Sequence, residues 1–367
     1  MKFENKKEFL SFCNAFYLYR MENERAAYIA KRRENRRAID YSRSKAGKIV
    51  YMDTIITDKN RVIGDVAKGG KLAGLAILRE SVNCGRCIFL RAMIDAGYLP
   101  EDTKLVSCFQ SETCKGCWQN FTQNHCGLMA KDKKESFADL DHCDPTLETI
   151  EKFFKSLFNT DKGRAFVYAA VPFIRAGQAG DSSHSFVTVE ETSNAAAFLD
   201  GFEKKNIDKP VVFISASYAP VSIDDYRKLL PYQDRSVLHF SLSPWFSDEE
   251  NALRIAGIKT ALDAGLENVF VRMVTNADRL DGWNNDRLAY IMQLLEFVGV
   301  GPERVLETPY HNDGAPGRPH SHATGIFKYR CCSSGSCLTC PVKCMTKWKD
   351  LEKTGVVYPE NEFHVKG

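Results

Sequence analysis

The chain has 367 residues, which is enough for one large α/β domain with appendages or for two domains of average size. Its composition, 44% hydrophobic and 26% charged, is typical of a globular protein, and a net charge of +3 by itself favours no class of partner. No window approaches about 18 uncharged apolar residues, which excludes a membrane-spanning helix. The first residues, "MKFENKKEFLSF", place Lys and Glu where a signal peptide needs an apolar run. We therefore expect a cytoplasmic protein with no membrane partner.

Thirteen cysteines are the most informative feature of the composition. A reducing cytoplasm does not sustain a disulfide framework, so clustered thiols indicate a metal or an iron–sulfur cluster. Cys13 stands alone, and we expect it to be a small buried hydrophobic residue. The other cysteines form groups along the chain: Cys84 and Cys87; Cys108, Cys114 and Cys117; Cys126 and Cys143; and Cys331, Cys332, Cys337, Cys340 and Cys344.

Residues 1–99 are expected to form a helical, partly basic N-terminal extension. Within it, residues 20–48 carry ten Lys or Arg against four Asp or Glu. One interpretation is a solvated helix laced with salt bridges. The other is a basic face that binds nucleic acid. Further along, the C-x2-C pair at 84 and 87 could join Cys126 and Cys143 in a metal site, although the spacing leaves their role open.

From about residue 100 onward, short runs rich in β-branched and aromatic residues alternate with helical segments. Such runs predict strands, and their nearly continuous apolar character is typical of strands buried on both faces. They lie at 103–108, 165–175, 210–217, 236–243, 268–275 and 304–310. The connections are long enough for crossovers, which predicts parallel βαβ units.

The segments between these strands carry helix signals. In "DPTLETIEKFFKSLF", Asp144 is a candidate N-cap with Pro145 at the first helical position. The segment "SDEENALRIAGIKTALDAG" begins with a Ser247/Glu250 capping box and ends at Gly265. A third helix is predicted in "NNDRLAYIMQLLEFVGV", where apolar residues recur at helical spacing.

Six strands alternating with helices fit an open doubly wound sheet or part of a TIM-like barrel. No G-x-G-x-x-G follows the first strand, so a dinucleotide-binding sheet loses its main support. Cys108, Cys114 and Cys117 follow it instead, at the strand end where loops of parallel α/β folds converge. As zinc ligands they need a fourth, from His125 or Cys126. As ligands of a [4Fe–4S] cluster, which normally takes four thiolates, they leave one iron open.

The triplet in "SCFQSETCKGCW", with the later "FIRAGQAGD", resembles the radical S-adenosylmethionine (SAM) superfamily, and most closely a branch found in phages and mobile elements. The superfamily's usual spacing is C-x3-C-x2-C, whereas this chain has C-x5-C-x2-C, and Trp118 follows the third cysteine where the family has an aromatic residue before it. The resemblance covers roughly residues 100–345. It implies a partial TIM-like (β/α)6 barrel over 100–315 and a cysteine-rich C-terminal module over 316–367.

The resemblance also implies a reaction. Cys108, Cys114 and Cys117 would hold a [4Fe–4S] cluster whose open iron binds SAM. One electron, from a donor such as flavodoxin or ferredoxin, would cleave the C5′–S bond and start hydrogen abstraction from a substrate that the sequence does not identify. The cofactor carries the chemistry, and the protein supplies position and electrostatics.

Several polar residues near strand ends are candidates for binding SAM. The glycine and aspartate after the second strand suit the ammonium group, and the serines suit ribose or carboxylate oxygens. The arginine on the fifth strand suits a bidentate bond to the SAM carboxylate. Each also has a structural interpretation, as a helix cap, a turn residue or a buried ion pair. The candidates are Gly180, Asp181, Ser215, Ser217, Ser241, Ser243 and Arg272.

The tail, "YRCCSSGSCLTCPVKCM", has the crowded cysteines of a metal site. The C-x4-C-x2-C-x3-C run suits an auxiliary [4Fe–4S] cluster or a structural zinc ion. Its ligands would be Cys332, Cys337, Cys340 and Cys344. The preceding loop, 310–325, carries His311, His320 and His322 and either lines a substrate entrance or is a surface linker.

A function of another class is consistent with the same features. The chain would then be a non-catalytic, zinc-stabilised nucleic-acid-binding protein. Residues 20–48 would form its basic face, and the cysteine groups would bind zinc ions that stabilise the fold. This alternative gives no reason for Arg272 within an apolar strand.

Overall fold

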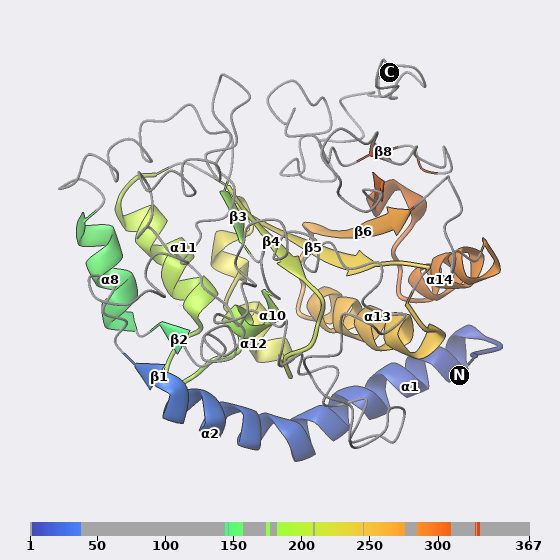
Figure 1. Cartoon of the computed structure of the whole chain (residues 1–367), viewed down its shortest axis with the longest axis horizontal. Helices are drawn as coiled ribbons and strands as arrows, with labels where there is room; N and C mark the ends of the chain where they lie inside the picture. Colours follow the sequence, from blue (N-terminus) through green and yellow to red (C-terminus); the bar gives the residue numbers. More distant parts are fainter. Residues whose placement is uncertain are drawn as a thin grey trace, which may run out of the picture.

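A computed structural model describes residues 2–37, 144–145, 147–156, 174–176, 182–207, 210–244, 246–275, 285–309, 327 and 329–330, and every structural statement below concerns these residues (Figure 1). The predicted strand at 103–108 and the domain boundaries predicted near 99 and 315 lie outside them.

The described chain begins with a long helical arm. Helix α1 (Lys6–Tyr19) continues through a π-helical turn, η1 (Arg20–Glu24), into α2 (Arg25–Asn35). The Asn5 side chain caps α1, because its oxygen accepts a hydrogen bond from the Glu8 amide at 3.0 Å. We call residues 6–35 the N-terminal arm.

A short ladder follows the arm. Strand β1 (Arg36–Arg37) pairs in parallel with β2 (Asp144–Pro145), and helix α8 (Leu147–Ser156) begins after it. The prediction that Asp144 and Pro145 start this helix was therefore wrong. Both residues have strong local helix-start signals, but the pairing with a strand far away in the sequence holds their backbone extended.

The other strands form one parallel sheet. They are β3 (Ile174–Ala176), β4 (Val211–Ser215), β5 (Ser236–Leu242), β6 (Val269–Thr275), β7 (Val305–Pro309) and β8 (Tyr329–Arg330). The strands are ordered as they are in the sequence, and each is parallel to the next. This arrangement confirms the predicted α/β class.

The predicted and observed strands agree best at the centre of the sheet. Strands β4 to β7 lie within the predicted runs 210–217, 236–243, 268–275 and 304–310. Strand β3 overlaps the end of the run 165–175. The sequence did not predict β8, because a two-residue strand is too short to show a periodic pattern.

Helices and short turns connect the strands. The helices are α10 (Ser183–Phe186), α11 (Asn194–Lys204), α12 (Ile223–Arg227), α13 (Asp248–Asp263) and α14 (Asn285–Phe297), and the turns are η5 (Leu230–Tyr232) and η6 (Pro302–Arg304). In Figure 1, α11, α13 and α14 lie along one side of the strands and the arm runs outside them. Helix α13 packs on β5 and β6, and α1 packs on α13 and α14. None of the described helices is both long and apolar enough to cross a bilayer.

Helix α13 begins and ends as predicted. The Ser247 side chain caps its first turn, and Gly265 follows its end with φ of +93°, a conformation that favours glycine. The capping box itself was only half right. The Glu250 carboxylate pairs with Arg254 inside the protein, because both side chains are buried there.

The two faces of the sheet differ in what they contact. Side chains of Phe240 and Leu242 on β5 and of Val271 and Met273 on β6 belong to the hydrophobic core with the helices. Side chains alternate along a strand, so the residues between them point to the opposite face. We call this opposite face the second face.

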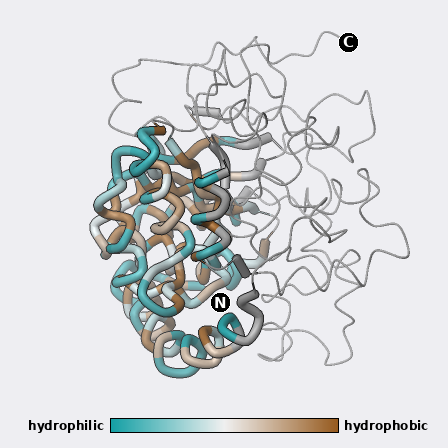
Figure 2. The backbone as a smooth tube through the Cα atoms, turned by 90° about the vertical axis from the view of Figure 1, so that its left-hand side faces the viewer, coloured by the Kyte–Doolittle hydropathy of each residue, from teal (hydrophilic) through white to brown (hydrophobic). Residues whose placement is uncertain are grey.

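Aromatic residues join the arm to the helices. Phe9 is fully buried, with its ring centroid 5.0 Å from that of Phe3 and 6.3 Å from that of Phe297 in α14. The Tyr290 hydroxyl accepts a hydrogen bond from the Phe3 amide at 2.7 Å. Figure 2 shows hydrophobic stretches inside the described part and hydrophilic turns toward its outside. The arm therefore forms a third layer, outside the sheet and its helices.

Candidate functional site

Two polar side chains form a row on the second face: Ser241, near the carboxyl end of β5, and Arg272, in the middle of β6. Ser241 of β5 is in register with Arg272 of β6, which is in register with Leu306 of β7. Arg272 is 8% exposed, and Leu306 is 1% exposed. A guanidinium is rarely buried to this degree, which sets Arg272 apart from the apolar residues beside it in the sheet.

The next row toward the amino ends adds a histidine. His239 of β5 is fully buried and is in register with Ile214 of β4 and Phe270 of β6. Its ring centroid lies 5.6 Å from that of Phe270. The sequence analysis missed His239, although it stands two positions before Ser241 in a strand and so had to share its face.

Together these side chains can bind an anion. The Arg272 guanidinium has the fork geometry that matches a carboxylate or a phosphate, and the Ser241 hydroxyl can donate or accept a further hydrogen bond. Burial strengthens such electrostatic contacts, because little water competes with them. In parallel α/β folds, ligands bind at the carboxyl ends of the strands, and Ser241 is the second-last residue of β5.

Arg254 of α13 fixes the carboxyl end of β5. Its Nη1 donates to the Ser241 carbonyl oxygen at 2.7 Å, and its Nη2 donates to the Tyr218 hydroxyl at 2.6 Å. Its guanidinium lies 4.1 Å from the ring centroid of Phe246 and pairs with Glu250. Burial raises the pKa of the Glu250 carboxyl, and the Arg254 charge opposes this rise.

Ser243 shapes the turn after β5. Its amide donates to Asn251 Oδ1 at 3.3 Å, and Asn251 Nδ2 donates to its carbonyl oxygen at 2.9 Å. These bonds tie the turn to the first half of α13. In the structure Ser243 is thus part of the helix start.

Ser215 and Ser217 lie on the helix side of the sheet. Ser215 is in register with Phe240, whose side chain packs among the helices, and its hydroxyl accepts a hydrogen bond from the Ser217 amide at 3.0 Å. Ser217 has φ of +61° and contacts Gly257 of α13 so closely that a Cβ on Gly257 would lie 2.4 Å from its hydroxyl oxygen. Both serines therefore stand apart from the row that contains Arg272.

Ser217 also lines a small cavity between the arm, the loop after β4 and α13. The cavity measures about 20 Å³, and Cys13 and Gly257 are among its other lining residues. Such a volume suits about one water molecule. Cys13 is buried as predicted, and burial raises the pKa of its thiol to about 12.

Side chains of the N-terminal arm hydrogen-bond the loop after β4, residues 216–222. Arg20 Nη1 donates to the Ser217 carbonyl oxygen at 3.0 Å, and Nη2 donates to the carbonyl oxygen of Tyr218. Arg25 Nη1 donates to the Pro220 carbonyl oxygen at 2.7 Å. Buried carbonyl groups need such partners, and here the arm supplies them.

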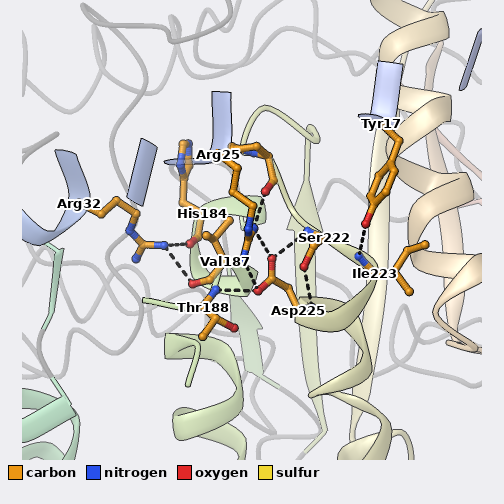
Figure 3. Close-up of polar contacts among 10 residues, drawn as sticks. Tyr17, Arg25, Arg32, His184, Val187, Thr188, Ser222, Ile223 and Asp225 are labelled. Carbon is orange, nitrogen blue, oxygen red and sulfur yellow. Dashed lines mark hydrogen bonds and ion pairs between the residues drawn. The ribbon is translucent and has the colours of Figure 1, made fainter. Parts of the chain in front are cut away.

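The arm also binds the carboxylate of Asp225 in α12 (Figure 3). Arg25 donates two hydrogen bonds to Asp225, at 2.5 and 2.9 Å, while the amides of Thr188 and Ser222 donate to the same carboxylate at 2.9 and 2.8 Å. Burial by itself would raise the pKa of Asp225, but the hydrogen bonds from Arg25, Ser222 and Thr188 outweigh it and hold the pKa below its usual value. This carboxylate thus joins the arm, α12 and the segment before α11.

The arm also holds the segment after β3. Arg32 donates to the carbonyl oxygens of His184 and Val187 (Figure 3). The Tyr28 hydroxyl hydrogen-bonds His184 Nδ1. His184 belongs to α10 and is 5% exposed. The loops after β3 and after β4 are therefore both anchored by arm side chains.

These contacts change the interpretation of the basic run 20–48. A solvated face was the first expectation, but Arg20, Arg25 and Arg32 bind carbonyl and carboxylate oxygens of the body. A nucleic-acid contact would have to rest on other basic residues of the run, of which Arg33 is exposed. The sequence analysis could not tell the two kinds of arginine apart.

The remaining site predictions fall outside the described residues. They are Gly180, Asp181 and the seven predicted metal ligands, Cys108, Cys114, Cys117, Cys332, Cys337, Cys340 and Cys344. Within the described part of the chain, which contains only Cys13 of the cysteines, no three His, Cys, Asp or Glu residues are placed to hold a metal ion.

Comparison of the chain with protein-family models, with curated proteins and with solved structures gave no match.

Proposed function

We propose that the protein is a radical SAM enzyme, which cleaves SAM reductively at a [4Fe–4S] cluster and starts hydrogen abstraction from a substrate. The observation that carries the proposal is the register of Ser241, near the carboxyl end of β5, with the buried Arg272 of β6, in a chain that also has the triplet Cys108, Cys114 and Cys117. The row suits a carboxylate, and the triplet suits a cluster with one open iron.

The order of the strands supports a barrel of the (β/α)6 type. A doubly wound sheet reverses its strand order at a switch point, where ligands bind. Here β3 to β8 follow one another without a reversal. Crossovers of one hand then put every connecting helix on the same face, which favours a sheet that curls around its second face. Arg272, His239 and Ser241 would in that case line the inside of the barrel.

The proposed ligands fall into two groups, those of the cluster and those of SAM. Cys108, Cys114 and Cys117 would hold the cluster, which when bound would supply the one electron that cleaves SAM into methionine and an adenosyl fragment, and this fragment would take a hydrogen atom from the substrate to give 5′-deoxyadenosine. Arg272 would bind the SAM carboxylate, with Ser241 beside it.

Other predicted SAM ligands take different parts in the proposal. Gly180 and Asp181, after β3, are assigned to the ammonium group of SAM. Ser215, Ser217 and Ser243 would shape the loops that frame the site, because Ser215 hydrogen-bonds the Ser217 amide while Ser217 and Ser243 contact α13.

The cysteine-rich tail extends the proposal. Strand β8 ends at Arg330, directly before Cys331, so the chain enters the tail from the carboxyl edge of the sheet. Cys332, Cys337, Cys340 and Cys344 would hold an auxiliary [4Fe–4S] cluster, and a zinc ion is the alternative. The activity needs an electron donor such as flavodoxin or ferredoxin, which we expect in the cytoplasm.

The first test is the metal and product content of purified protein. Anaerobically reconstituted wild type should contain iron and sulfide and should form 5′-deoxyadenosine from SAM with dithionite. A Cys108/Cys114/Cys117→Ala variant should lose the product and part of the iron. Zinc in place of iron, together with intact SAM, would overturn the proposal.

A second test addresses the Arg272 row. Arg272→Met should raise the Kd for SAM by about tenfold or more, because a charge-assisted bidentate contact is lost. Arg235→Met is the matched control. Arg235 precedes β5 at the opposite edge of the sheet and donates to the Ile207 carbonyl oxygen. An equal effect of both substitutions would argue against a SAM site at this row.

A further inference from the structure

The loop 216–222 connects the N-terminal arm to the Ser241–Arg272 row. On one side, Arg20 and Arg25 hold the carbonyl oxygens of Ser217, Tyr218 and Pro220. On the other side, the Tyr218 side chain reaches the carboxyl end of β5, where Arg254 joins its hydroxyl to the Ser241 carbonyl oxygen. The arm is therefore connected to the end of β5 by hydrogen bonds on both sides of Tyr218, one at its carbonyl oxygen and one at its hydroxyl.

The π-helical turn explains why two arm residues act on the same loop. The Arg25 amide donates to the Arg20 carbonyl oxygen, a spacing of five residues that widens the turn. In a regular α-helix, side chains five residues apart diverge by more than a quarter turn. The wider turn brings Arg20 and Arg25 closer to the same side, toward the loop. Single π-turns of this kind occur frequently at functional sites.

The loop also contains local strain. Ser217 has φ of +61°, which is uncommon for a residue other than glycine. Its buried hydroxyl oxygen, in a side chain that is 8% exposed, has no hydrogen-bond partner among the described residues. A strained residue persists only where its surroundings determine the backbone, and here the arm supplies those surroundings.

We propose that the N-terminal arm is a positioning element of the proposed SAM site, acting through Tyr218 and Arg254 on the end of β5. The inference rests on the proposed function, since the ligand it positions is SAM. The arm itself does not touch the ligand. Arg20, Tyr218 and Arg254 are positioning residues, which hold Ser241 at the distance and angle that Arg272 needs in a shared site.

The test uses two variants of the full chain and one control. Tyr218→Phe removes only the hydroxyl that accepts from Arg254 and keeps the ring, so the fold is retained. Arg20→Met removes the hydrogen bonds to the loop and keeps an apolar stem. Arg33→Met removes the same charge from an exposed position on the same arm. The readouts are the Kd for SAM after anaerobic reconstitution, the rate of 5′-deoxyadenosine formation and amide hydrogen exchange.

We expect the Kd for SAM to rise about tenfold in Tyr218→Phe, the effect of one lost hydrogen bond to a charged group, and to a similar extent in Arg20→Met, which loses two hydrogen bonds on the same path. The Kd should stay unchanged in Arg33→Met. Exchange should become faster at residues 216–222 but not in β6. The two substitutions share one path, so the double variant should be affected about as strongly as either single one. An unchanged Kd in Tyr218→Phe, or fully additive effects, would overturn the inference even if wild type cleaves SAM.

The same experiment tests the proposed function separately from the role of the arm. If wild type does not bind SAM, the radical SAM proposal fails. The role of the arm in positioning residues 216–222 is then tested by hydrogen exchange alone. Faster exchange confined to 216–222 would then support the arm as the element that positions this loop. Exchange that changes uniformly, or not at all, would overturn that role as well.

Discussion

At the scale of single residues, the Asp225 carboxylate joins three parts of the chain. Its side chain is 2% exposed and accepts hydrogen bonds from Arg25, Thr188 and Ser222. Asp225→Asn should lower the free energy of unfolding by about 3 kcal/mol at pH 7, because it leaves the Arg25 charge without its partner. Asp224→Asn is the control, since Asp224 is exposed and pairs only with a surface arginine among the described contacts, and it should change stability by less than about 0.5 kcal/mol.

The same carboxylate predicts a dependence on pH. The folded pKa of Asp225 lies below its unfolded value, so its stabilising effect is complete above the unfolded pKa of about 3.9 and is lost as the pH falls through the folded pKa. Urea unfolding of wild type and of Asp225→Asn should therefore differ at pH 7 and converge in strong acid. A difference that is constant with pH would show that the charge of Asp225 plays no part.

A close contact between Ser217 and Gly257 gives a second residue-scale prediction. A Cβ at position 257 would lie 2.4 Å from the Ser217 hydroxyl oxygen, so Gly257→Ala should destabilise the protein although alanine is the better helix former. Ser217→Gly removes the clashing atoms and suits the positive φ, and should stabilise the chain by about 0.5–1 kcal/mol. The double variant should recover most of the loss, as measured by thermal unfolding. If Ser217→Gly does not recover the stability that Gly257→Ala loses, the steric clash does not involve Ser217.

At the scale of elements, α8 and α11 pack through a glycine. A Cβ at Gly201 would lie 2.1 Å from the Phe154 ring, which packs against Phe198 and Phe202 with centroid distances of 5.5 and 5.3 Å. Gly201→Ala would gain about 1 kcal/mol at an exposed helix position, yet here it should lower the melting temperature. Glu203→Ala, on an exposed position of the same helix, should leave it nearly unchanged. A rise in melting temperature for Gly201→Ala would mean that α8 does not pack tightly on α11.

At the scale of the whole molecule, the arm is an integral layer. Phe9 is fully buried against α14, whereas Leu18 on the same helix is 54% exposed. Phe9→Ala should therefore cost about 3–5 kcal/mol, and hydrogen exchange should become faster in α13 and α14 as well as in the arm. Leu18→Ala should have little effect on either. Faster exchange confined to the arm would show that it folds as a separate unit.

The sequence by itself determined the features that depend on neighbouring residues. The runs of β4 to β7 were predictable from their apolar, β-branched composition, and Ser247 and Gly265 marked the ends of α13. Arg272 stood out because a charge within an apolar strand is unusual. These signals are local, since a strand, a cap and a helix end each depend on a few consecutive residues.

Only the tertiary structure decided which side chains share a site. Ser217 and Ser241 looked alike in the sequence, both near strand ends, but register puts Ser241 beside Arg272 while Ser217 contacts α13. Likewise, Arg20 looked solvated, yet it bonds a carbonyl group 197 residues away. The physical reason is the same in both cases. A hydrogen bond depends on which atoms the fold brings within about 3 Å, and that proximity is set by packing across the whole chain.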